Sequence, residues 1–178
     1  MNREMPSVMR PALFLDRDGV INVDHGHVYR KEDFDFIPGI FDLVSRANAA
    51  GWLVVIVTNQ AGIAKNYYSE ADFRLLMKWV CQQFAQRGAH IDGVYHCPHH
   101  PEFGPEETRN CNCRKPNPGM LLSAAADLNI DLRQSVLIGD KQSDLQAAQE
   151  AGVLRSYLFE TDSHHKNVNL FAKRNFSF

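Results

Sequence analysis

The 178-residue chain lacks a long apolar run, since none of its hydrophobic stretches approaches the ~18 residues needed to span a membrane. Its first residues, Met1–Pro11, also lack the apolar core of a signal peptide. Cysteine is scarce, at four residues, and a cytoplasmic protein keeps such thiols reduced. We therefore expect a cytoplasmic protein with no membrane partner and no disulfide framework.

An excess of basic charge is missing as well. Lys and Arg number 19 against 21 Asp and Glu, so the net charge is -2, and aromatic residues do not gather among the basic ones. Surfaces that bind nucleic acid are basic, so this balance disfavours a nucleic-acid-binding module and we expect no nucleic-acid partner. Internal repeats and low-complexity linkers are absent too, so we expect residues 1–178 to form a single domain.

Strands and helices alternate along the chain in the sequence pattern. Short apolar runs predict strands at Ala12–Asp16, Trp52–Thr58, Ile91–His96, Ser135–Gly139 and Val153–Phe159. Helical spacing predicts helices at Gly39–Ala50, Ser69–Gly88, Pro118–Leu128 and Ser143–Ala151, with Cys81 in the core. Such alternation predicts an α/β fold, a Rossmann-like parallel sheet with helices on both faces. No helical bundle interrupts it, so we expect no large cap domain.

Polar residues follow three of the predicted strands. They are Asp16-Arg17-Asp18-Gly19, Thr58-Asn59-Gln60 and Gly139-Asp140, and Asp144 opens the next helix. Each group alone is more often a solvated turn or a cap, and Asp144 is equally suited to orienting a site or capping its helix. Because the carboxyl ends of parallel strands meet at one edge, their coincidence favours chemistry there. Asp140 offers the oxygen that Mg²⁺ prefers.

Two close ligand pairs, Cys97-x-His99 and Cys111-x-Cys113, predict a structural zinc site in the loop 97–113. His100 is the rival histidine, and free thiols beside a surface histidine are the alternative interpretation. The loop has few large apolar residues, so metal binding would supply its order. Zinc there would hold Arg114 and Lys115 at the mouth of the site.

Asp16-Arg17-Asp18-Gly19, Thr58, Lys115 and Gly139-Asp140 together resemble the four motifs of the haloacid dehalogenase (HAD) superfamily of phosphatases. The resemblance extends from about Ala12 to Phe159. It implies that Asp16 is the nucleophile and Asp18 the acid/base, while Thr58 and Lys115 hold the phosphoryl oxygens. It also implies that catalytic Mg²⁺ binds Asp16, the backbone carbonyl of Asp18, and Asp140.

A narrower resemblance is to the heptose-1,7-bisphosphate 7-phosphatase family, which serves lipopolysaccharide core biosynthesis. The matching segments are Asn22–Gly26, Thr58–Ala64, Cys97–Pro101, Cys113–Met120 and Gly139–Lys141. The related histidinol-phosphate phosphatases share the zinc loop, but this chain lacks their acidic residue at position 61. It carries Ala61 there, where the heptose enzymes often have Ser. Hydrolysis of a heptose bisphosphate is thus expected, with histidinol phosphate or another small sugar phosphate as the alternative substrate.

The resemblance implies that the partner is a small-molecule sugar bisphosphate, and we expect the protein to be a monomer. Residues expected to contact the substrate are Asp24, His25, Gly26, His27, Asn59, Gln60, Ala61, Arg114 and Lys141. The planar Arg114 guanidinium suits a second phosphate. For His25 and His27, the alternative is a pair of exposed loop histidines. Nothing is transferred to the tail, residues 160–178, which does not resemble the family.

Overall fold

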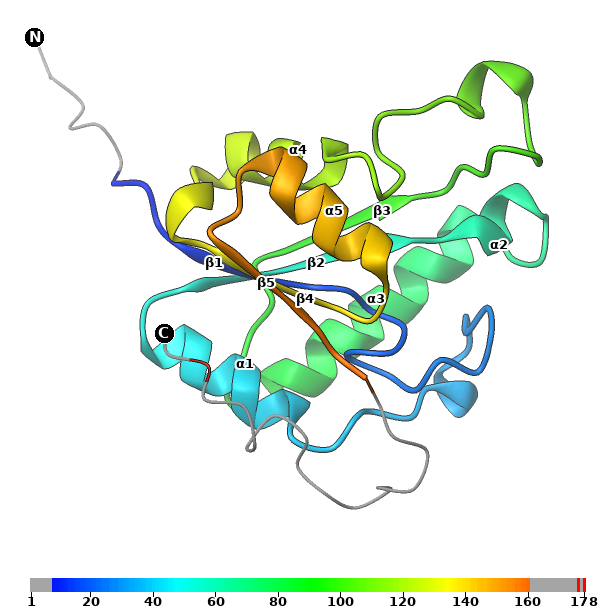
Figure 1. Cartoon of the computed structure of the whole chain (residues 1–178). Helices are drawn as coiled ribbons and strands as arrows, with labels where there is room; N and C mark the ends of the chain where they lie inside the picture. Colours follow the sequence, from blue (N-terminus) through cyan, green and yellow to red (C-terminus); the bar gives the residue numbers. More distant parts are fainter. Residues whose placement is uncertain (1–7, 161–175, 177) are drawn as a thin grey trace, which may run out of the picture.

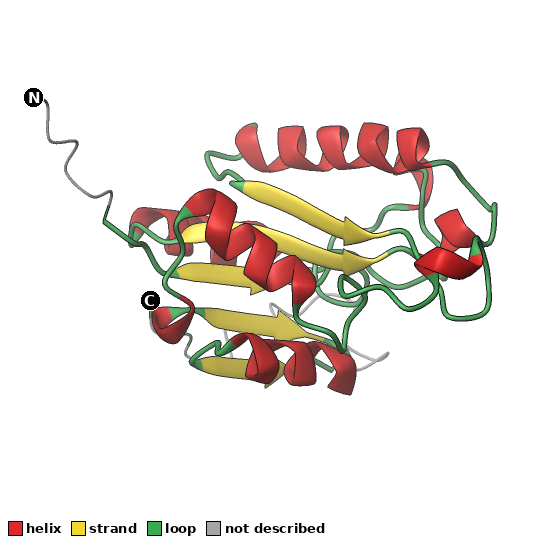
Figure 2. Ribbon diagram, turned by 90° about the horizontal axis from the view of Figure 1, so that it is seen from above, coloured by secondary structure: helices red, strands yellow, loops and turns green. Residues whose placement is uncertain are grey.

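The computed structural model describes residues 8–160, 176 and 178. The described residues form a five-stranded parallel sheet in the order β3-β2-β1-β4-β5. The strands are β1 (Ala12–Leu15), β2 (Leu53–Asn59), β3 (Gly93–Cys97), β4 (Val136–Gly139) and β5 (Arg155–Leu158). All arrows point the same way in Figure 2, so every strand ends at one edge of the sheet. The predicted parallel α/β fold is confirmed.

Helices cover both faces of the sheet (Figures 1 and 2). On one face, α1 (Ile40–Ala49) and α3 (Glu70–Ala85) pack against side chains such as Leu15 and Ile56. On the other, α4 (Gly119–Leu128) and α5 (Gln142–Ala151) pack against Phe14 and Val55. Because alternate residues of a strand point to opposite faces, an unbroken apolar strand supplies both cores at once.

The strand order places a topological switch point beside β1. From β1 the chain proceeds to β2 and β3 on one side, then crosses to β4 and β5 on the other. The main-chain amide of Asp16 donates to the carbonyl of Ile138 at 3.0 Å, which joins the ends of β1 and β4. Ligands of open α/β sheets bind in the crevice at such a point, so the carboxyl ends of β1 and β4 mark the site.

Three short elements follow strands at this edge: the single-turn helix α2 (Ala61–Ala64) and the 3₁₀ turns η1 (Lys31–Asp33) and η2 (Glu106–Thr108). A further 3₁₀ turn, η3 (Leu132–Gln134), precedes β4 at the opposite edge. The pattern did not predict α2, because one turn is too short to show a helical period. Between β1 and β2, which the structure describes throughout, only η1 and α1 intervene, in keeping with the expected lack of a large cap.

Helix α3 begins as the sequence predicts. Ser69 accepts a hydrogen bond from the Asp72 amide, and the Asp72 carboxylate accepts one from the Ser69 amide. The expectation that Cys81 lies in the core is wrong, since it is only half-buried while its neighbour Val80 is fully buried. Cys81 lies at the margin of the apolar stripe, where the helix surface turns towards solvent.

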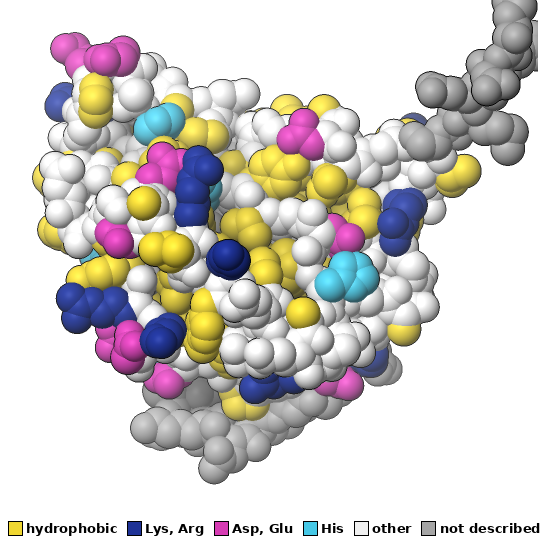
Figure 3. All heavy atoms as spheres, turned by 180° about the vertical axis from the view of Figure 1, so that it is seen from behind, with side chains coloured by type: hydrophobic (Ala, Val, Ile, Leu, Met, Phe, Trp, Pro, Cys, Tyr) yellow, Lys and Arg dark blue, Asp and Glu magenta, His cyan; other side chains and the backbone are white. Residues whose placement is uncertain are grey.

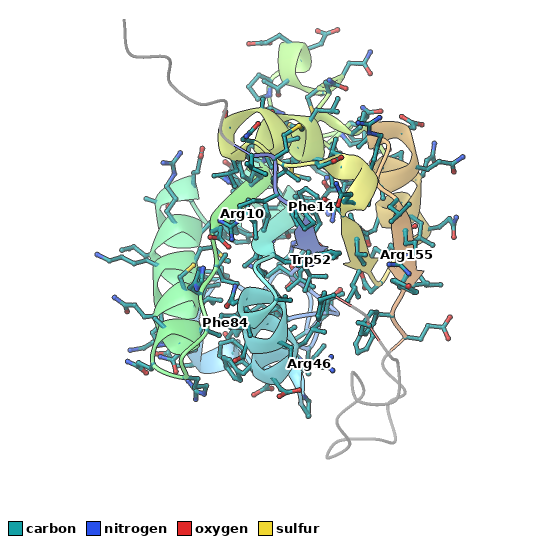
Figure 4. The ribbon with its side chains drawn as sticks, turned by 90° about the vertical axis from the view of Figure 1, so that its left-hand side faces the viewer. Arg10, Phe14, Arg46, Trp52, Phe84 and Arg155 are labelled. Atoms are coloured by element: carbon teal, nitrogen blue, oxygen red, sulfur yellow. The ribbon has the colours of Figure 1, made fainter. Side chains whose placement is uncertain are left out.

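The end of the chain returns to the sheet. Figure 4 shows Arg46 on α1 and Trp52 just before β2, and the ring of Phe178 lies 5.3 Å from that of Trp52. The Arg46 guanidinium lies 5.8 Å from the same ring. Residues 161–175 and 177 of the tail lie outside the described part. None of the helices in the described part of the chain is long and apolar enough to cross a membrane.

Candidate active site

A buried cluster of charge occupies the carboxyl edge of the sheet. Lys115 Nζ lies 2.9 Å from Asp16 Oδ1 and 2.5 Å from Asp144 Oδ1, and it donates to the carbonyl of Val57 at 2.8 Å. Asp16, Lys115 and Asp144 are 5%, 4% and 1% exposed. Burying a charge is costly unless it is paired, so this ammonium and its two carboxylates depend on one another.

Burial also changes the proton affinity of these groups. Burial raises the pKa of Asp16 to about 7, although the nearby Lys115 opposes the shift. Burial alone lowers the pKa of Lys115, but the Asp16 and Asp144 carboxylates raise it above its usual value. Burial likewise raises the pKa of Asp140. The site therefore holds more acidic groups than its own cation balances.

This acidic group has the make-up of a divalent metal site. Ligand oxygens of Asp16, Asp140 and Asp144 all lie within 4.8 Å of one another. Among the described residues, the buried Oδ1 of Asp140 has no hydrogen-bond partner. Asp144 is already occupied, since its oxygens meet Lys115 Nζ and the Lys141 amide. Asp16 and Asp140 thus fit a hard cation such as Mg²⁺, while Asp144 both holds Lys115 and caps α5.

Asp18 is the second carboxylate of the β1 end, and three donors hold it. Its Oδ1 accepts from Arg17 Nη2 at 2.7 Å and from Asn22 Nδ2 at 3.0 Å, and its Oδ2 accepts from Gln60 Nε2 at 3.2 Å. Gly19 follows with φ +85°, and an added Cβ there would collide with Asp140. Glycine therefore lets the chain turn at this point and leaves room for the Asp140 carboxylate.

A cavity of about 370 Å³ opens above these groups. The predicted site residues that line it are Asp16, Asp18, Asp24, Gly26, His27, Asn59, Gln60, Ala61, Arg114, Lys115 and Lys141. Three other residues predicted for this site, His25, Thr58 and the magnesium ligand Asp140, are not part of the lining. His25 Nε2 lies 2.8 Å from Asp35 Oδ2, outside the lining, and Thr58 is 1% exposed beneath the cavity. Gly26 and His27, at φ 78° and 51°, reverse the chain and direct the two histidines differently.

Several polar side chains of the lining have protein partners of their own. Both polar atoms of Asn59 bond to the backbone of Lys115. Arg114 Nη1 donates to the His99 carbonyl at 3.0 Å, and Lys141 Nζ lies 3.6 Å from Asp24 and 3.7 Å from Asp140. Two cations, on Arg114 and Lys141, therefore flank the cavity in addition to Lys115.

The cavity is also lined by Tyr68, Ser143 and Asp144, which the sequence did not assign to the substrate or the metal, although Asp144 was considered for orienting the site. Asp144 carried a signal, because it stands four residues after Asp140 at a helix start. Tyr68 carried none, since it lies beyond α2 with no motif around it. Its hydroxyl donates to Gln60 Oε1 at 2.6 Å.

The loop between β3 and α4 extends past the edge of the sheet beside α2 (Figure 1). At its two ends, ligand atoms of Cys97, His99, Cys111 and Cys113 lie within 4.8 Å of one another. Burial opposes ionisation of Cys111, but hydrogen bonds from His99 and Cys113 lower the pKa of its thiol to about 7. His100, the rival ligand, instead accepts a hydrogen bond from the Glu102 amide. The geometry thus suits one tetrahedral metal ion.

Charges of both signs are mixed on the face of the molecule that is turned away from the viewer in Figure 1. Figure 3 shows Lys and Arg side chains interspersed there with Asp and Glu. A nucleic-acid footprint needs a patch of one sign, so this face does not favour that class of partner.

Comparison with known proteins places the chain among phosphatases. A family model described as HAD-hydrolase-like matches residues 112–174. The chain is 50% identical over 153 residues to a D-glycero-β-D-manno-heptose-1,7-bisphosphate 7-phosphatase of Vibrio cholerae, covering 85% of this chain and 82% of that one. It is 55% identical over 143 residues to a D-glycero-α-D-manno-heptose-1,7-bisphosphate 7-phosphatase of Burkholderia mallei, covering 80% and 76%.

Two solved structures share the fold at substantial identity. A HAD-like phosphatase of Mesorhizobium loti matches with a TM-score of 0.80 and 39% identity, over 84% of this chain and 72% of that one. The D,D-heptose 1,7-bisphosphate phosphatase of B. bronchiseptica, solved with magnesium and phosphate, matches with a TM-score of 0.74 and 34% identity, over 83% and 79%.

Proposed function

The chain belongs to the D-glycero-D-manno-heptose-1,7-bisphosphate 7-phosphatase family of HAD hydrolases, and we propose that it removes the 7-phosphate of such a sugar. One observation supports this above all. The buried Asp16 carboxylate lies at the floor of the cavity, 2.9 Å from the Lys115 ammonium, with Asp18 two residues away. A nucleophile, a cation and a proton donor therefore face the same space.

Phosphoryl transfer begins with attack by an Asp16 oxygen on phosphorus. The bond from phosphorus to the sugar oxygen breaks, and an aspartyl phosphate forms on Asp16. Lys115 offsets the charge of the transferring oxygens. Such transfer depends chiefly on positioning and charge neutralisation. Lys115, held in place by two carboxylates, supplies a fixed donor for these oxygens.

Asp18 moves the protons of both half-reactions. Its carboxyl group first gives a proton to the departing sugar oxygen. The resulting carboxylate then takes a proton from the water that attacks the aspartyl phosphate, which releases inorganic phosphate and restores Asp16. Thr58, lying beneath the cavity, accepts a hydrogen bond from Gln60 and supports the phosphate-facing end of β2.

Mg²⁺ fits the acidic group described above. Asp16, Asp140 and the backbone carbonyl of Asp18 would hold it, and it would supply the positive charge that eases the approach of two anions. Asp144 keeps Lys115 in place beside this position.

The distal part of a bisphosphate needs a second cationic contact. Arg114 and Lys141 both line the cavity, and a guanidinium binds phosphate in a bidentate manner. Asp24 and His27 approach from the loop after β1, with Asn22 fixing its start by donating to the Val23 carbonyl. These residues provide charge and hydrogen bonds for the sugar hydroxyls and the second phosphate.

A structural Zn²⁺ on Cys97, His99, Cys111 and Cys113 completes the proposal. Four ligands close the tetrahedral shell, so this ion would have no open position for a substrate. Its effect is to hold Arg114 and Lys115, which follow Cys113 directly. Reduced thiols at this site suit a cytoplasmic enzyme. We further expect the protein to act as a monomer, which its elution volume in size-exclusion chromatography will check.

The test is a phosphate-release assay with Mg²⁺ over both anomers of D-glycero-D-manno-heptose 1,7-bisphosphate, sugar monophosphates and histidinol phosphate. Asp16→Asn is the matched control, because it keeps the size and removes the nucleophilic charge. Release from a heptose bisphosphate that depends on Mg²⁺ and disappears in the variant supports the proposal. Faster turnover of histidinol phosphate would identify histidinol phosphate as the substrate instead. Activity retained by Asp16→Asn would refute the mechanism.

A further inference from the structure

The Asp18 carboxylate is held from two directions. Arg17 and Asn22, its neighbours in sequence, reach Oδ1, while Gln60 comes from the end of β2 and reaches Oδ2. The orientation of Oδ2 towards the cavity thus depends on an amide from another strand. What fixes that amide therefore matters to the proton donor.

Gln60 is 2% exposed, so its partners alone decide which way its amide faces. Its Nε2 donates to Thr58 Oγ1 at 2.9 Å and to Asp18 Oδ2 at 3.2 Å, and its Oε1 accepts from Tyr68 at 2.6 Å. A carboxyl oxygen keeps a lone pair whether or not the group carries a proton, so the amide nitrogen that faces Asp18 Oδ2 can donate to it in both states. The amide oxygen then needs a donor on its other side, and Tyr68 is that donor.

Tyr68 is itself firmly placed. It is 6% exposed and stacks on Tyr29 with ring centroids 5.0 Å apart and ring planes 12° apart. Gly62 leaves space for it, because an added Cβ at this position would overlap the Tyr68 ring. Burial raises the pKa of Tyr68 to about 12, so its hydroxyl remains a donor at any working pH.

We propose that Tyr68 is a positioning residue for the acid/base Asp18 and acts through the Gln60 amide. The inference rests on the proposed function only in taking Asp18 as the proton donor. Without the Tyr68 hydroxyl, Gln60 Oε1 is buried with its donor removed, and the amide is free to turn its oxygen towards Asp18. The amide oxygen would then repel the ionised carboxylate or accept the proton that the carboxyl group has to deliver, and Oδ2 would no longer be held ready for the sugar oxygen.

The test uses Tyr68→Phe and two esters that differ in their need for a proton. A sugar alkoxide must be protonated as it leaves, whereas p-nitrophenolate is a good leaving group without a proton. Single-turnover rates with enzyme in excess report the first half-reaction alone. We expect the variant to cleave heptose 1,7-bisphosphate about 10-fold more slowly, the size of one lost buried hydrogen bond, and p-nitrophenyl phosphate less than about 2-fold more slowly.

A double-mutant cycle shows whether Tyr68 acts through Gln60. In a Gln60→Ala background, adding Tyr68→Phe should leave the sugar-phosphate rate unchanged. Gly62→Ala, which displaces the same ring, should slow the sugar phosphate more than the aryl phosphate. Tyr29→Phe is the control, since it retains the stacked ring and should behave as the unmodified protein. Circular dichroism and melting temperature verify that each variant is folded.

An equal loss on both esters, or additive effects in the cycle, would overturn the inference. Failure of the proposed function is separable. If the unmodified protein leaves heptose bisphosphate intact, the sugar assignment fails, and the comparison proceeds with whichever alkyl phosphate the protein hydrolyses. The same difference between alkyl and aryl esters then supports or refutes the role of Tyr68.

Discussion

The side chain of Asn59 forms two hydrogen bonds with the backbone of Lys115, which lies 56 residues later in the sequence. Its Nδ2 donates to the Lys115 carbonyl, and its Oδ1 accepts from the Lys115 main-chain N–H, both at 3.0 Å. The pair joins the end of β2 to the segment that carries the buried ammonium. Asn59 was expected to meet a sugar hydroxyl, but both of its polar atoms are engaged with this backbone. Its position at the cavity wall thus also serves to place the lysine.

Asn59→Ala should therefore lower kcat rather than binding. Small displacements of a catalytic cation are costly, and we expect a fall of roughly 10- to 100-fold. Asn59→Asp keeps the acceptor for the Lys115 amide but sets a second acceptor against the Lys115 carbonyl, so it should not restore the activity. Steady-state kinetics on the sugar bisphosphate measure both, and a change confined to KM would assign Asn59 to the substrate instead.

Removal of the buried cation should destabilise the fold. In Lys115→Met, the Asp16 and Asp144 carboxylates lose their shared partner, which should cost about 3–5 kcal/mol in the free energy of unfolding. The double variant Lys115→Met/Asp144→Asn should recover part of this loss, since it leaves one less buried charge. Urea unfolding provides the measurement. If the double variant is less stable than the single one, the unpaired charge of Asp144 is not what destabilises Lys115→Met.

Stability of the metal-free protein should depend on pH through Asp16. The pKa of Asp16 is raised from 3.8 to about 7 by burial, so its contribution to stability is full below pH 3.8 and is lost as pH rises through 7. Asp16→Asn removes this dependence. The melting temperature of the variant, relative to the unmodified protein, should be higher at pH 8 than at pH 5, and Mg²⁺ should reduce the difference at pH 8.

The pH experiment has an internal control, because Lys115 stays charged at both pH values and the difference between them reports the ionisation of Asp16. Differential scanning calorimetry in the presence of a chelator gives both melting temperatures. If Asp16→Asn changes the melting temperature by the same amount at pH 5 and pH 8, the result would contradict the raised pKa of Asp16.

The Cys/His group should bind one zinc ion for each chain. Cys111→Ser should lower the zinc content and the activity, while the far-ultraviolet circular dichroism of the sheet and helices remains. Cys81→Ser is the matched control, because Cys81 lies on α3 away from this group. Elemental analysis and phosphate release are the measurements. Unchanged kinetics in zinc-free protein would refute the positioning role of the loop.

The two histidines of the loop after β1 should differ. His27 lines the cavity, whereas His25 is paired with Asp35. We expect His27→Ala to raise KM for the sugar bisphosphate by about 5- to 10-fold, the value of one or two hydrogen bonds. His25→Ala should have a much smaller effect. If His25→Ala raised KM more than His27→Ala, the loop would have to change conformation when substrate binds.

The sequence was most informative where the chemistry is local. The apolar run before Thr58 predicted a doubly covered strand, and Ser69 with Asp72 predicted the start of α3. The ligand pairs Cys97-x-His99 and Cys111-x-Cys113 predicted a group that the fold brings together. In each case the residues that interact are close in sequence or form a period, so the pattern contains the information.

Contacts between distant segments were beyond the sequence. Arg17 reads as part of a polar turn, yet it is fully buried, with Nη2 shared between Asp18 and the Val28 carbonyl. The rings of Phe34 and Phe73 flank its guanidinium at 5.9 and 5.8 Å. No spacing rule joins positions 17, 34 and 73, because their meeting depends on how the loop after β1 folds over α3.

The Cys97, His99, Cys111 and Cys113 group has a consequence for how the loop that carries it can change. Cys97 is the last residue of β3, and its carbonyl accepts a hydrogen bond from the main-chain N–H of Gln60 at 2.8 Å. Cys113 directly precedes Arg114 and Lys115. Both ends of the loop 97–113 are thus held next to the reacting groups. Residues 100–110 between them do not line the cavity. Exchange of this stretch should therefore alter the outer surface of the loop while the reacting groups keep their places.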